Sequence, residues 1–314
     1  MNLATFYNIK DENISVSFLP KLGFYYKNFK TPIPKNYNGV ITIIRTVFSL
    51  GDWGIISGLP YALKQIYPKC KILIPTPEWN KHVFKFWFDN GGNQSVWKNP
   101  WENSELIFKN NPYIDYRFNI GEIKGDLFHD HYRVYTDNEE EPLVEQMLRF
   151  FGASENQIQS IDSRPQLFFD KDEIKLGEEI IDTYIKDKKF GTLLLSTANP
   201  KYSVPWDKKI DKNVINETKK YKNLKFLYYS QVPLEQTPYN FIDGININDL
   251  NLPIRIQLYI KSKALINLGY QSGINDSVGT RTTKIVCATP YNSIGSNIGR
   301  GIKYYNGDNL TYLK

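Results

Sequence analysis

Two stretches in which apolar strands alternate with amphipathic helices constrain the fold of this chain most. In the first, residues 39–76, short apolar runs at 40–45 and 71–75 flank a helical pattern from about Ile55 to Tyr67. Short runs rich in β-branched residues predict buried strands, and apolar residues at helical spacing predict an amphipathic helix. The stretch is therefore predicted to form a βαβ unit with parallel strands.

A second alternation begins at the strand pattern GTLLLS, residues 191–196, and ends at TKIVCAT, residues 283–289. The elements expected between these two strands are helices at 211–221 and 253–262, a further helix after residue 270, and strands at 225–230, 245–247 and 264–270. Two successive α/β stretches of similar size predict an α/β protein made of two Rossmann-like domains that face each other across a cleft.

The boundary between these domains is expected near residue 168, with an N-terminal domain at 1–168 and a C-terminal domain at 169–314. Residues 1–38, rich in aromatic residues and prolines, precede the first strand as an N-terminal extension. A helix is expected to end at a Gly152 cap, and the polar segment 154–164 is expected to be a linker. The segments LIFKN and YRFNI are expected to be short strands.

Composition limits the classes of partner. The chain has 314 residues, 41% of them hydrophobic, enough for a large core in two domains. Its net charge of +6 comes from 39 basic and 33 acidic residues spread along the sequence. Nucleic-acid binding favours a concentrated basic face, so nucleic acid is not an expected partner, and the charge indicates only a modest preference for anionic ligands.

Targeting signals and cysteines point to a cytoplasmic protein. No apolar run approaches the roughly 18 residues of a transmembrane helix, and the start MNLATFYNIKDEN lacks a basic region followed by an apolar core. The chain is therefore expected to be soluble and unexported, while its 22 tyrosines and 6 tryptophans leave peripheral contact with a membrane open. Cys70 and Cys287 lack metal-ligand spacing and are expected to be buried thiols.

The loop after the first strand holds the first candidate catalytic residue. Gly51 permits a tight turn and close approach of a ligand to the backbone, and Asp52 is expected to follow the strand where its carboxylate can face the cleft. A carboxylate in this place can act as a general base toward an attacking hydroxyl. A cap of the following helix is the alternative interpretation of Asp52.

Two loops of the second alternation hold candidate phosphate ligands. Ser196, Thr197 and Lys201 follow the strand GTLLLS, and hydroxyl groups and a lysine can bind phosphate oxygens. After the strand ALINLGY comes a turn that leads into an expected helix, and it contains Gln271, Ser272, Gly273 and Asp276. Free N–H groups at a helix N-terminus suit a diphosphate, although Asp276 adds negative charge. Ordinary polar turns remain the alternative for both loops.

A competing site is His129-Asp130-His131. On a strand, the two imidazoles of a His-x-His pair point the same way, but the sequence shows no third metal ligand nearby. Surface histidines, contact with an acceptor and, last, metal binding are the three interpretations.

In this order the elements resemble glycosyltransferase family 9, the lipopolysaccharide heptosyltransferase family. The matching segments are Gly51-Asp52 with Leu59-Pro60-Tyr61-Ala62-Leu63 and Tyr67-Pro68, EPLVEQMLRFFG with the trailing RPQLFF, STANPKYSVPW and LINLGYQSGIND. The resemblance covers about residues 39–290, most of the chain.

The resemblance implies a GT-B fold that needs no metal or other cofactor. It also implies that the N-terminal domain mainly binds the acceptor and the C-terminal domain mainly binds the nucleotide-sugar donor. At the matching positions it implies that Asp52 is the general base, that Ser196, Thr197 and Lys201 face the donor diphosphate, and that Ser272 and Gly273 form a second phosphate-binding turn.

The sequence departs from the family at two positions. Gln271 stands where the family usually has aspartate, and Asp276 stands where it usually has a donor-binding histidine. A carboxylate near a diphosphate is repulsive unless it is turned away or binds a sugar hydroxyl. The donor therefore need not be ADP-heptose.

The expected function is inverting, single-displacement transfer of a sugar from a nucleotide-diphosphate donor to a hydroxyl of a glycan or glycolipid. The alternatives are a GT-B transferase that uses a GDP- or UDP-sugar and a non-catalytic nucleotide- or sugar-binding protein on a degenerate GT-B scaffold.

Overall fold

The chain divides into two compact units, unit 1 at Met1–Leu167 and unit 2 at Phe168–Lys314. The structure, a computed structural model, describes residues 36–44, 50–82, 99–119, 127–130, 143–150, 152–186, 189–195, 208–270, 284–288 and 310–313. Among the described helices, none combines the length and the apolar composition that crossing a bilayer requires.

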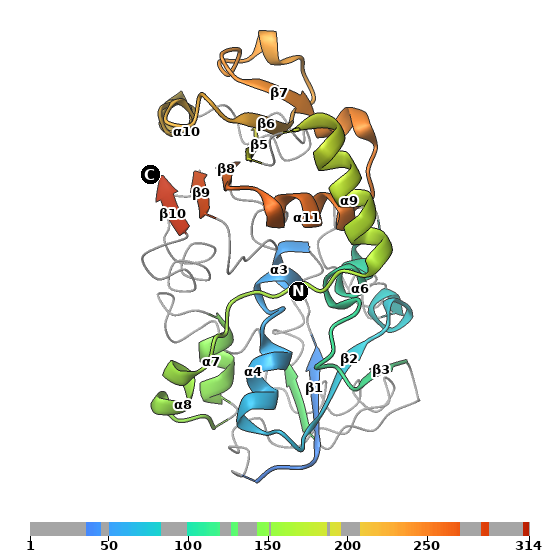
Figure 1. The fold of residues 1–314 in the computed structure, drawn as a ribbon. Coiled ribbons are helices and arrows are strands. Elements are labelled where there is room, and N and C mark those ends of the chain that lie inside the picture. The colour runs from blue at the N-terminus through green and yellow to red at the C-terminus, as the bar shows by residue number, and fades with distance from the viewer. Residues whose placement is uncertain are drawn as a thin grey trace. The chain divides into compact units, whose positions relative to one another are not determined.

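Unit 1 contains a parallel sheet whose strands run in the order β3-β2-β1-β4 (Figure 1). Its strands are β1 (Val40–Ile44), β2 (Lys71–Pro75), β3 (Tyr116–Phe118) and β4 (Leu127–Asp130). Both β1 and β2 were expected from their apolar runs, and the parallel pairing of Ile41 with Ile72 confirms the βαβ unit. The segment YRFNI also contains a strand, β3, as expected.

The helices of unit 1 are short, and α4 (Leu59–Ile66) among them shows a clear apolar stripe. They are α3 (Leu50–Ile55), α4 (Leu59–Ile66), the 3-10 turn η2 (Pro100–Glu102), α6 (Asn103–Phe108), α7 (Leu143–Phe150) and α8 (Glu155–Ser160). In α4 the buried residues Leu59, Ala62, Leu63 and Ile66 recur at helical spacing. This stripe is what the sequence pattern predicted.

Unit 2 contains a six-stranded parallel sheet in the order β10-β9-β8-β5-β6-β7. The strands are β5 (Phe190–Leu194), β6 (Lys225–Tyr229), β7 (Asp243–Asn246), β8 (Ile266–Tyr270), β9 (Lys284–Ala288) and β10 (Leu310–Leu313). The sequence predicted every one of these except β10.

Helices cover both faces of this sheet. They are α9 (Lys171–Tyr184), α10 (Lys208–Lys219) and α11 (Ile254–Lys263), with the 3-10 turns η5 (Leu234–Gln236) and η6 (Ile247–Leu250). Leu193 of β5 and Leu195, the residue after its end, pack with Val214 of α10, whereas Phe190 and Leu194 pack with α9 and α11 on the other face. This alternation along β5 is expected of a parallel strand that is buried on both faces.

Three expectations for local structure are wrong, and helical spacing explains two of them. The helix expected from Ile55 to Tyr67 is α4, which begins only at Leu59, and Leu50-Gly51-Asp52 lies in a separate helix, α3, and not in a loop. Leu50 and Trp53, three residues apart, are both buried, so the helical stripe begins before Ile55. The segment LIFKN is largely helical in α6, since Ser104, Ile107 and Phe108 are buried at helical spacing.

The third correction concerns 154–164, which was expected to be a linker and contains helix α8. The side chain of Ser154 accepts from the backbone N–H of Gln157, and the Gln157 side chain accepts from the backbone of Ser154, which together form a capping box. Just before it, α7 ends at Phe150, and Gly152, the expected cap, has a φ of 87°. The N–H of Ala153 reaches Leu148 O at 3.0 Å, as in a Schellman motif.

Candidate active site

The strand order of unit 2 reverses at the boundary between β5 and β8. The chain runs from β5 to its neighbour β6 on one side, and β8 later pairs with the other side of β5, with Leu194 opposite Gly269. In open α/β sheets, ligands bind beyond the carboxyl ends of the strands at such a reversal. The carboxyl ends of β5 and β8 are therefore the candidate ligand site of unit 2.

Both loops that the sequence analysis selected follow these two strands. The loop with Ser196, Thr197 and Lys201 follows β5, and the turn with Gln271, Ser272, Gly273 and Asp276 follows β8. All seven residues lie outside the described part of the chain. Their roles therefore stay predictions, while the strands that lead into them are described in full.

Gly269 lets β8 approach β5 closely at the end of the pair. Its φ is +124°, and a Cβ atom built there would lie 2.1 Å from Leu194 O. Only glycine fits this conformation and this contact. The sequence analysis did not select Gly269, although a glycine inside the apolar strand ALINLGY is a recognised signal of close backbone approach.

A polar chain lies inside the fold on the α9 and α11 side of the same strand pair. Lys261 Nζ donates to Thr192 Oγ1 at 2.8 Å, and Thr192 Oγ1 donates to Asn267 Oδ1 at 2.5 Å. All three residues are fully buried. The sequence analysis missed this chain because Thr192 lies 69 residues before Lys261 and 75 before Asn267.

Unit 1 has its own reversal between β1 and β4. β1 pairs with β2 on one side and β4 on the other, and the last residues of β1 and β4, Ile44 and Asp130, are register partners. His129 and Asp130 thus lie at the carboxyl end of β4, whereas His131 is outside the described residues. This edge is the candidate ligand site of unit 1.

Asp52 follows the carboxyl end of β1 closely in the sequence. It is the third residue of α3, and the structure describes its backbone. The next residue, Trp53, is fully buried and packs edge-on against Phe108 of α6, with ring centroids 5.9 Å apart. After α3, the hydroxyl of Ser57 donates to Gly54 O at 2.7 Å and accepts from Gln166 N at 2.8 Å. These contacts fix the helix that carries Gly51 and Asp52.

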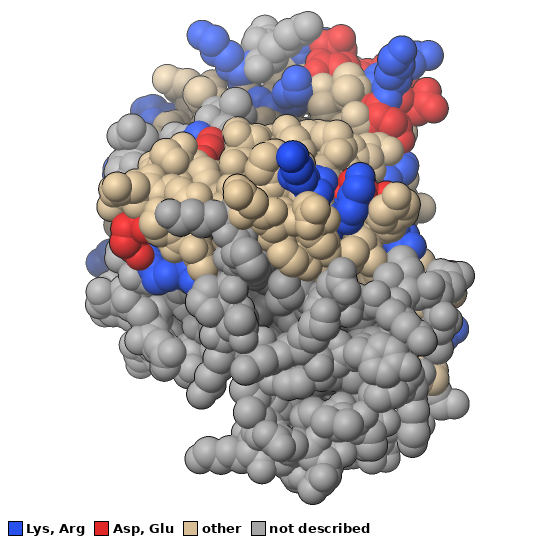
Figure 2. All heavy atoms as spheres, turned by 90° about the horizontal axis from the view of Figure 1, so that it is seen from below, with Lys and Arg blue, Asp and Glu red and all other residues tan. Residues whose placement is uncertain are grey.

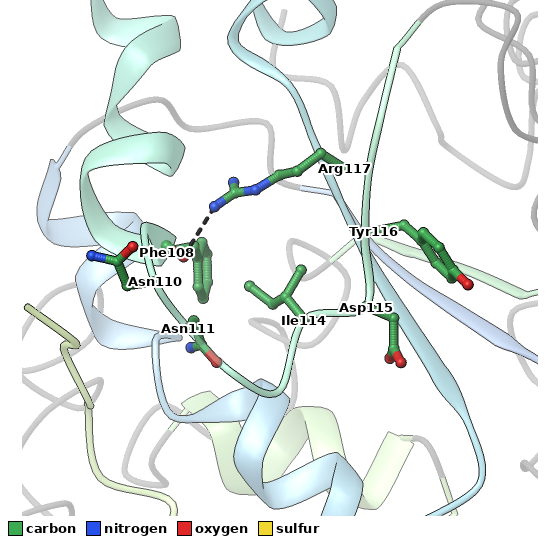
Figure 3. A pocket seen from close by; sticks show the side chains of 7 residues that line it. All are labelled: Phe108, Asn110, Asn111, Ile114, Asp115, Tyr116 and Arg117. Atoms are coloured by element: carbon green, nitrogen blue, oxygen red, sulfur yellow. Dashed lines mark hydrogen bonds between the residues drawn. The ribbon is translucent and has the colours of Figure 1, made fainter. Parts of the chain in front are cut away.

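A pocket in unit 1 lies at the opposite edge of its sheet (Figure 3). It surrounds the loop before β3, where Asp115 accepts from the backbone N–H of Ile72 at the start of β2. Arg117 lines it and donates to Phe108 O at 3.0 Å, and burial lowers the pKa of this guanidinium. The pocket volume of about 200 Å³ is below the roughly 300 Å³ of ordinary ligand pockets. None of its lining residues belongs to the carboxyl ends of β1 and β4.

Metal ligands and surface charge are further features of the described residues. Over the part of the chain that the structure describes, there is no group of three or more His, Cys, Asp and Glu side chains that could hold a metal ion. On the face drawn in Figure 2, the described acidic and basic side chains are interspersed. The view gives no sign of a single-sign patch among those residues.

Solved structures identify the architecture. A glycosyl transferase of family 9 from Veillonella parvula DSM 2008 superimposes with a TM-score of 0.56 at 10% sequence identity, over 90% of this chain and 87% of that one. The chain shares its fold with this glycosyl transferase. The GT-B fold that the sequence resemblance implied is therefore confirmed at the level of the fold.

A second solved structure, the ADP-heptose lps heptosyltransferase II of E. coli, gives a TM-score of 0.42 at 10% identity, over 88% of this chain and 90% of that one. The fold assignment rests on the first structure. Neither a scan against models of protein families nor a search of curated proteins finds a match.

Proposed function

We propose that this GT-B protein is a glycosyltransferase that moves a sugar from a nucleotide-diphosphate donor to a hydroxyl of a glycan or glycolipid. One observation carries the proposal. The two segments of unit 2 that the sequence selects for diphosphate binding follow neighbouring strands, β5 and β8, at the point where the strand order reverses. A shared fold with a family 9 glycosyl transferase supports the same conclusion.

In this proposal the C-terminal domain binds the donor. Ser196, Thr197 and Lys201 contact the diphosphate oxygens, and the turn at Ser272 and Gly273 adds backbone N–H donors. Gln271 and Asp276 lie beside the same ligand. Because Asp276 is acidic, we assign it to a sugar hydroxyl and not to phosphate.

Asp52 acts on the acceptor, which the N-terminal domain binds. Its carboxylate accepts the proton of the acceptor hydroxyl as that oxygen forms a bond to the anomeric carbon. The bond from the anomeric carbon to the diphosphate breaks at the same time, and the nucleoside diphosphate leaves with the electron pair. Attack from the face opposite the leaving group inverts the anomeric centre. Lys201 and the backbone N–H groups stabilise the leaving diphosphate, so the reaction proceeds without a metal.

The departures at Gln271 and Asp276 favour a second candidate, a GT-B transferase whose donor is a GDP- or UDP-sugar. A comparison of ADP-, GDP- and UDP-sugars as donors distinguishes this candidate from a transferase that uses an ADP-sugar. The cytoplasmic location and the peripheral contact with a membrane stay predictions.

The test is the variant Asp52→Asn. We expect transfer, measured as release of nucleoside diphosphate in the presence of acceptor, to fall by about a hundredfold to ten-thousandfold, the usual contribution of a general base. Affinity for the nucleoside diphosphate and the melting temperature should stay as in the wild type. The matched control is Asp172→Asn, at an exposed position of α9, which should transfer normally. Near-normal turnover of Asp52→Asn would exclude Asp52 as the base.

A further inference from the structure

One helix of unit 2 carries most of the net charge of the chain. Helix α10 and the turn that follows it, residues 208–223, contain six lysines, no arginine and two acidic residues, Asp211 and Glu217. Their net charge is therefore +4, in a chain whose net charge is +6. Charged residues of both signs are spread along the sequence, but the excess of positive charge is concentrated here.

The lysines of α10 share one side of the helix. At about 100° per residue, positions 208, 212 and 219 fall within about 40° of one another around the helix axis. Lys212 and Lys219 are exposed, and so are Lys220 and Lys222 in the turn after the helix. We call Lys212, Lys219, Lys220 and Lys222 the basic face.

The opposite side of α10 belongs to the core of unit 2. Val214 and Thr218 are only 1% and 0% exposed, and Val214 packs with Leu193 of β5. The helix lies on the face of the sheet opposite α9 and α11 (Figure 1). The apolar stripe of this amphipathic helix is therefore used inside the protein, and the basic face is presented outward.

Helix stability does not explain this placement of charge. A cation is favourable near a helix C-terminus, where Lys219 lies, and unfavourable near a helix N-terminus. Yet α10 begins with two lysines, at positions 208 and 209. Within the described part of the chain, the pair of Lys220 with Glu217 is the only ion pair that the basic face makes. Most of its charge is thus directed to solvent.

An anionic lipid surface is the partner that fits this face. Clusters of four to eight basic residues on an amphipathic helix are typical of proteins that bind anionic lipid head groups. Sites for nucleic acid favour arginine, whose planar guanidinium binds phosphate in a fixed geometry and stacks on bases. Residues 208–223 contain no arginine. Lysine is a compact point charge, which suits a fluid surface without fixed geometry.

We propose that the basic face of α10 binds the surface of an anionic lipid bilayer. Because the apolar side of α10 is buried in unit 2, the helix lies on the head groups and does not insert between the acyl chains. Binding is therefore electrostatic, reversible and sensitive to salt. This inference stands on charge and exposure and does not depend on the proposed sugar transfer.

The experiment measures flotation of the full chain with vesicles of phosphatidylcholine mixed with phosphatidylglycerol. We expect the wild type to float with these vesicles at low salt and not with vesicles of phosphatidylcholine alone. At about 1 M salt, where the Debye length is about 3 Å, the protein should be released.

The test variant carries Lys212→Gln, Lys219→Gln and Lys222→Gln. Each lysine near an anionic surface contributes about fivefold to binding, so this variant should bind about a hundredfold more weakly. Lys220 is left in place because of its ion pair. Arginine at the same three positions keeps the charge and should restore binding. The melting temperature should not change, because all three side chains are exposed.

The matched control removes the same charge elsewhere in unit 2. It carries Lys171→Gln, Lys175→Gln and Lys189→Gln, at three exposed positions of which the first two lie in α9. Helix α9 packs on the other face of the sheet. The control should therefore bind nearly as well as the wild type.

Four outcomes would overturn the inference. They are no flotation of the wild type with anionic vesicles at low salt, equal losses in the glutamine variant and the control, binding that persists at about 1 M salt, and tighter binding to polyuridylic acid than to the vesicles. The last would assign the basic face to nucleic acid. Binding of nucleoside diphosphates tests the proposed function separately: a protein that floats but binds none of them keeps this surface and loses the proposed transfer.

Discussion

Each unit buries a threonine in the middle of its first sheet strand, but the hydroxyl groups of these two threonines differ in their hydrogen bonds. Thr42 of β1 and Thr192 of β5 both have a relative exposure of 0%. The hydroxyl of Thr42 has no hydrogen-bond partner among the described residues. That of Thr192 accepts from Lys261 and donates to Asn267. The core of unit 1 thus tolerates a polar atom, whereas that of unit 2 uses one to connect three elements.

Ion pairs repeat this contrast. In unit 2, Arg255 of α11 donates to Glu173 of α9 at 2.6 Å, and the two side chains are only 5% and 10% exposed. In unit 1, Arg117 and Glu105 lie 2.9 Å apart but are 27% and 42% exposed. In this comparison the more buried ion pair lies in unit 2, whereas the pair in unit 1 is partly exposed. Three predictions test this difference, in order of expected effect.

The largest effect is expected for Arg255→Met. It removes a guanidinium that binds Glu173, the backbone oxygen of Phe168 and, at 5.1 Å, the ring of Phe169. The carboxylate of Glu173 is left buried without this partner, which usually costs about 3–5 kcal/mol. Urea unfolding followed by far-UV circular dichroism measures the loss.

Arg117→Met is the matched control in unit 1. Because its ion pair is partly exposed, we expect a loss of about 1 kcal/mol or less. Tryptophan fluorescence assigns the effects, since five of the six tryptophans lie before residue 168. Equal losses for the two arginine variants would contradict the contrast between the units.

A smaller difference is expected between Thr192→Val and Thr42→Val. The first leaves Lys261 and Asn267 without their shared hydroxyl, and unsatisfied buried groups cost about 1–3 kcal/mol. The second removes a hydroxyl that has no partner among the described residues, so we expect a change near zero or a slight gain. The difference in the free energy of unfolding between these two isosteric variants is the decisive measurement. A comparable loss in both would show that Thr42 also serves a polar role.

The sequence predicts the elements of both units better than it predicts these polar connections. Apolar runs and helical stripes are local, so β1, β2, α4 and the strands from β5 to β9 follow from the pattern. Helix α3 was mistaken for a loop because glycine and aspartate beside a strand also suit a turn. Helix α8 was missed because its only buried residue is Ile158. Local patterns are thus sufficient for most elements and insufficient at their ends.

The candidate site shows the same limit more strongly. The loops after β5 and β8 were selected from hydroxyl, lysine and glycine residues that are close in sequence. Lys261 and Thr192 are separated by 69 residues, and Thr192 and Asn267 by 75. No periodicity links positions so far apart, because only the strand order of the sheet brings them together. In the sequence, Lys261 is simply a lysine near the end of an expected helix, and such a lysine is usually exposed to solvent.

The smallest effect is expected at Asp115, a partly buried carboxylate directly before β3 in unit 1. Burial raises the pKa of Asp115, but hydrogen bonds from Lys64, the backbone of Ile72 and Lys71 lower it below its ordinary value. The ionised form is therefore favoured by folding. Its contribution is present above the unfolded pKa, about 3.9, and is lost as the pH falls through the lower pKa of the folded state.

We therefore expect Asp115→Asn to cost about 1 kcal/mol at neutral pH, as partly exposed ion pairs do, and to lose less further stability than the wild type on acidification below pH 4. Two lysine variants provide the internal comparison. Lys64 lies 2.7 Å from the carboxylate and is 18% exposed, whereas Lys71 lies 3.1 Å away and is 52% exposed. Lys64→Met should therefore flatten the acid limb of the unfolding curve more than Lys71→Met. The reverse order would mean that burial does not set the strength of these pairs, and the contrast between the two units would lose its physical basis.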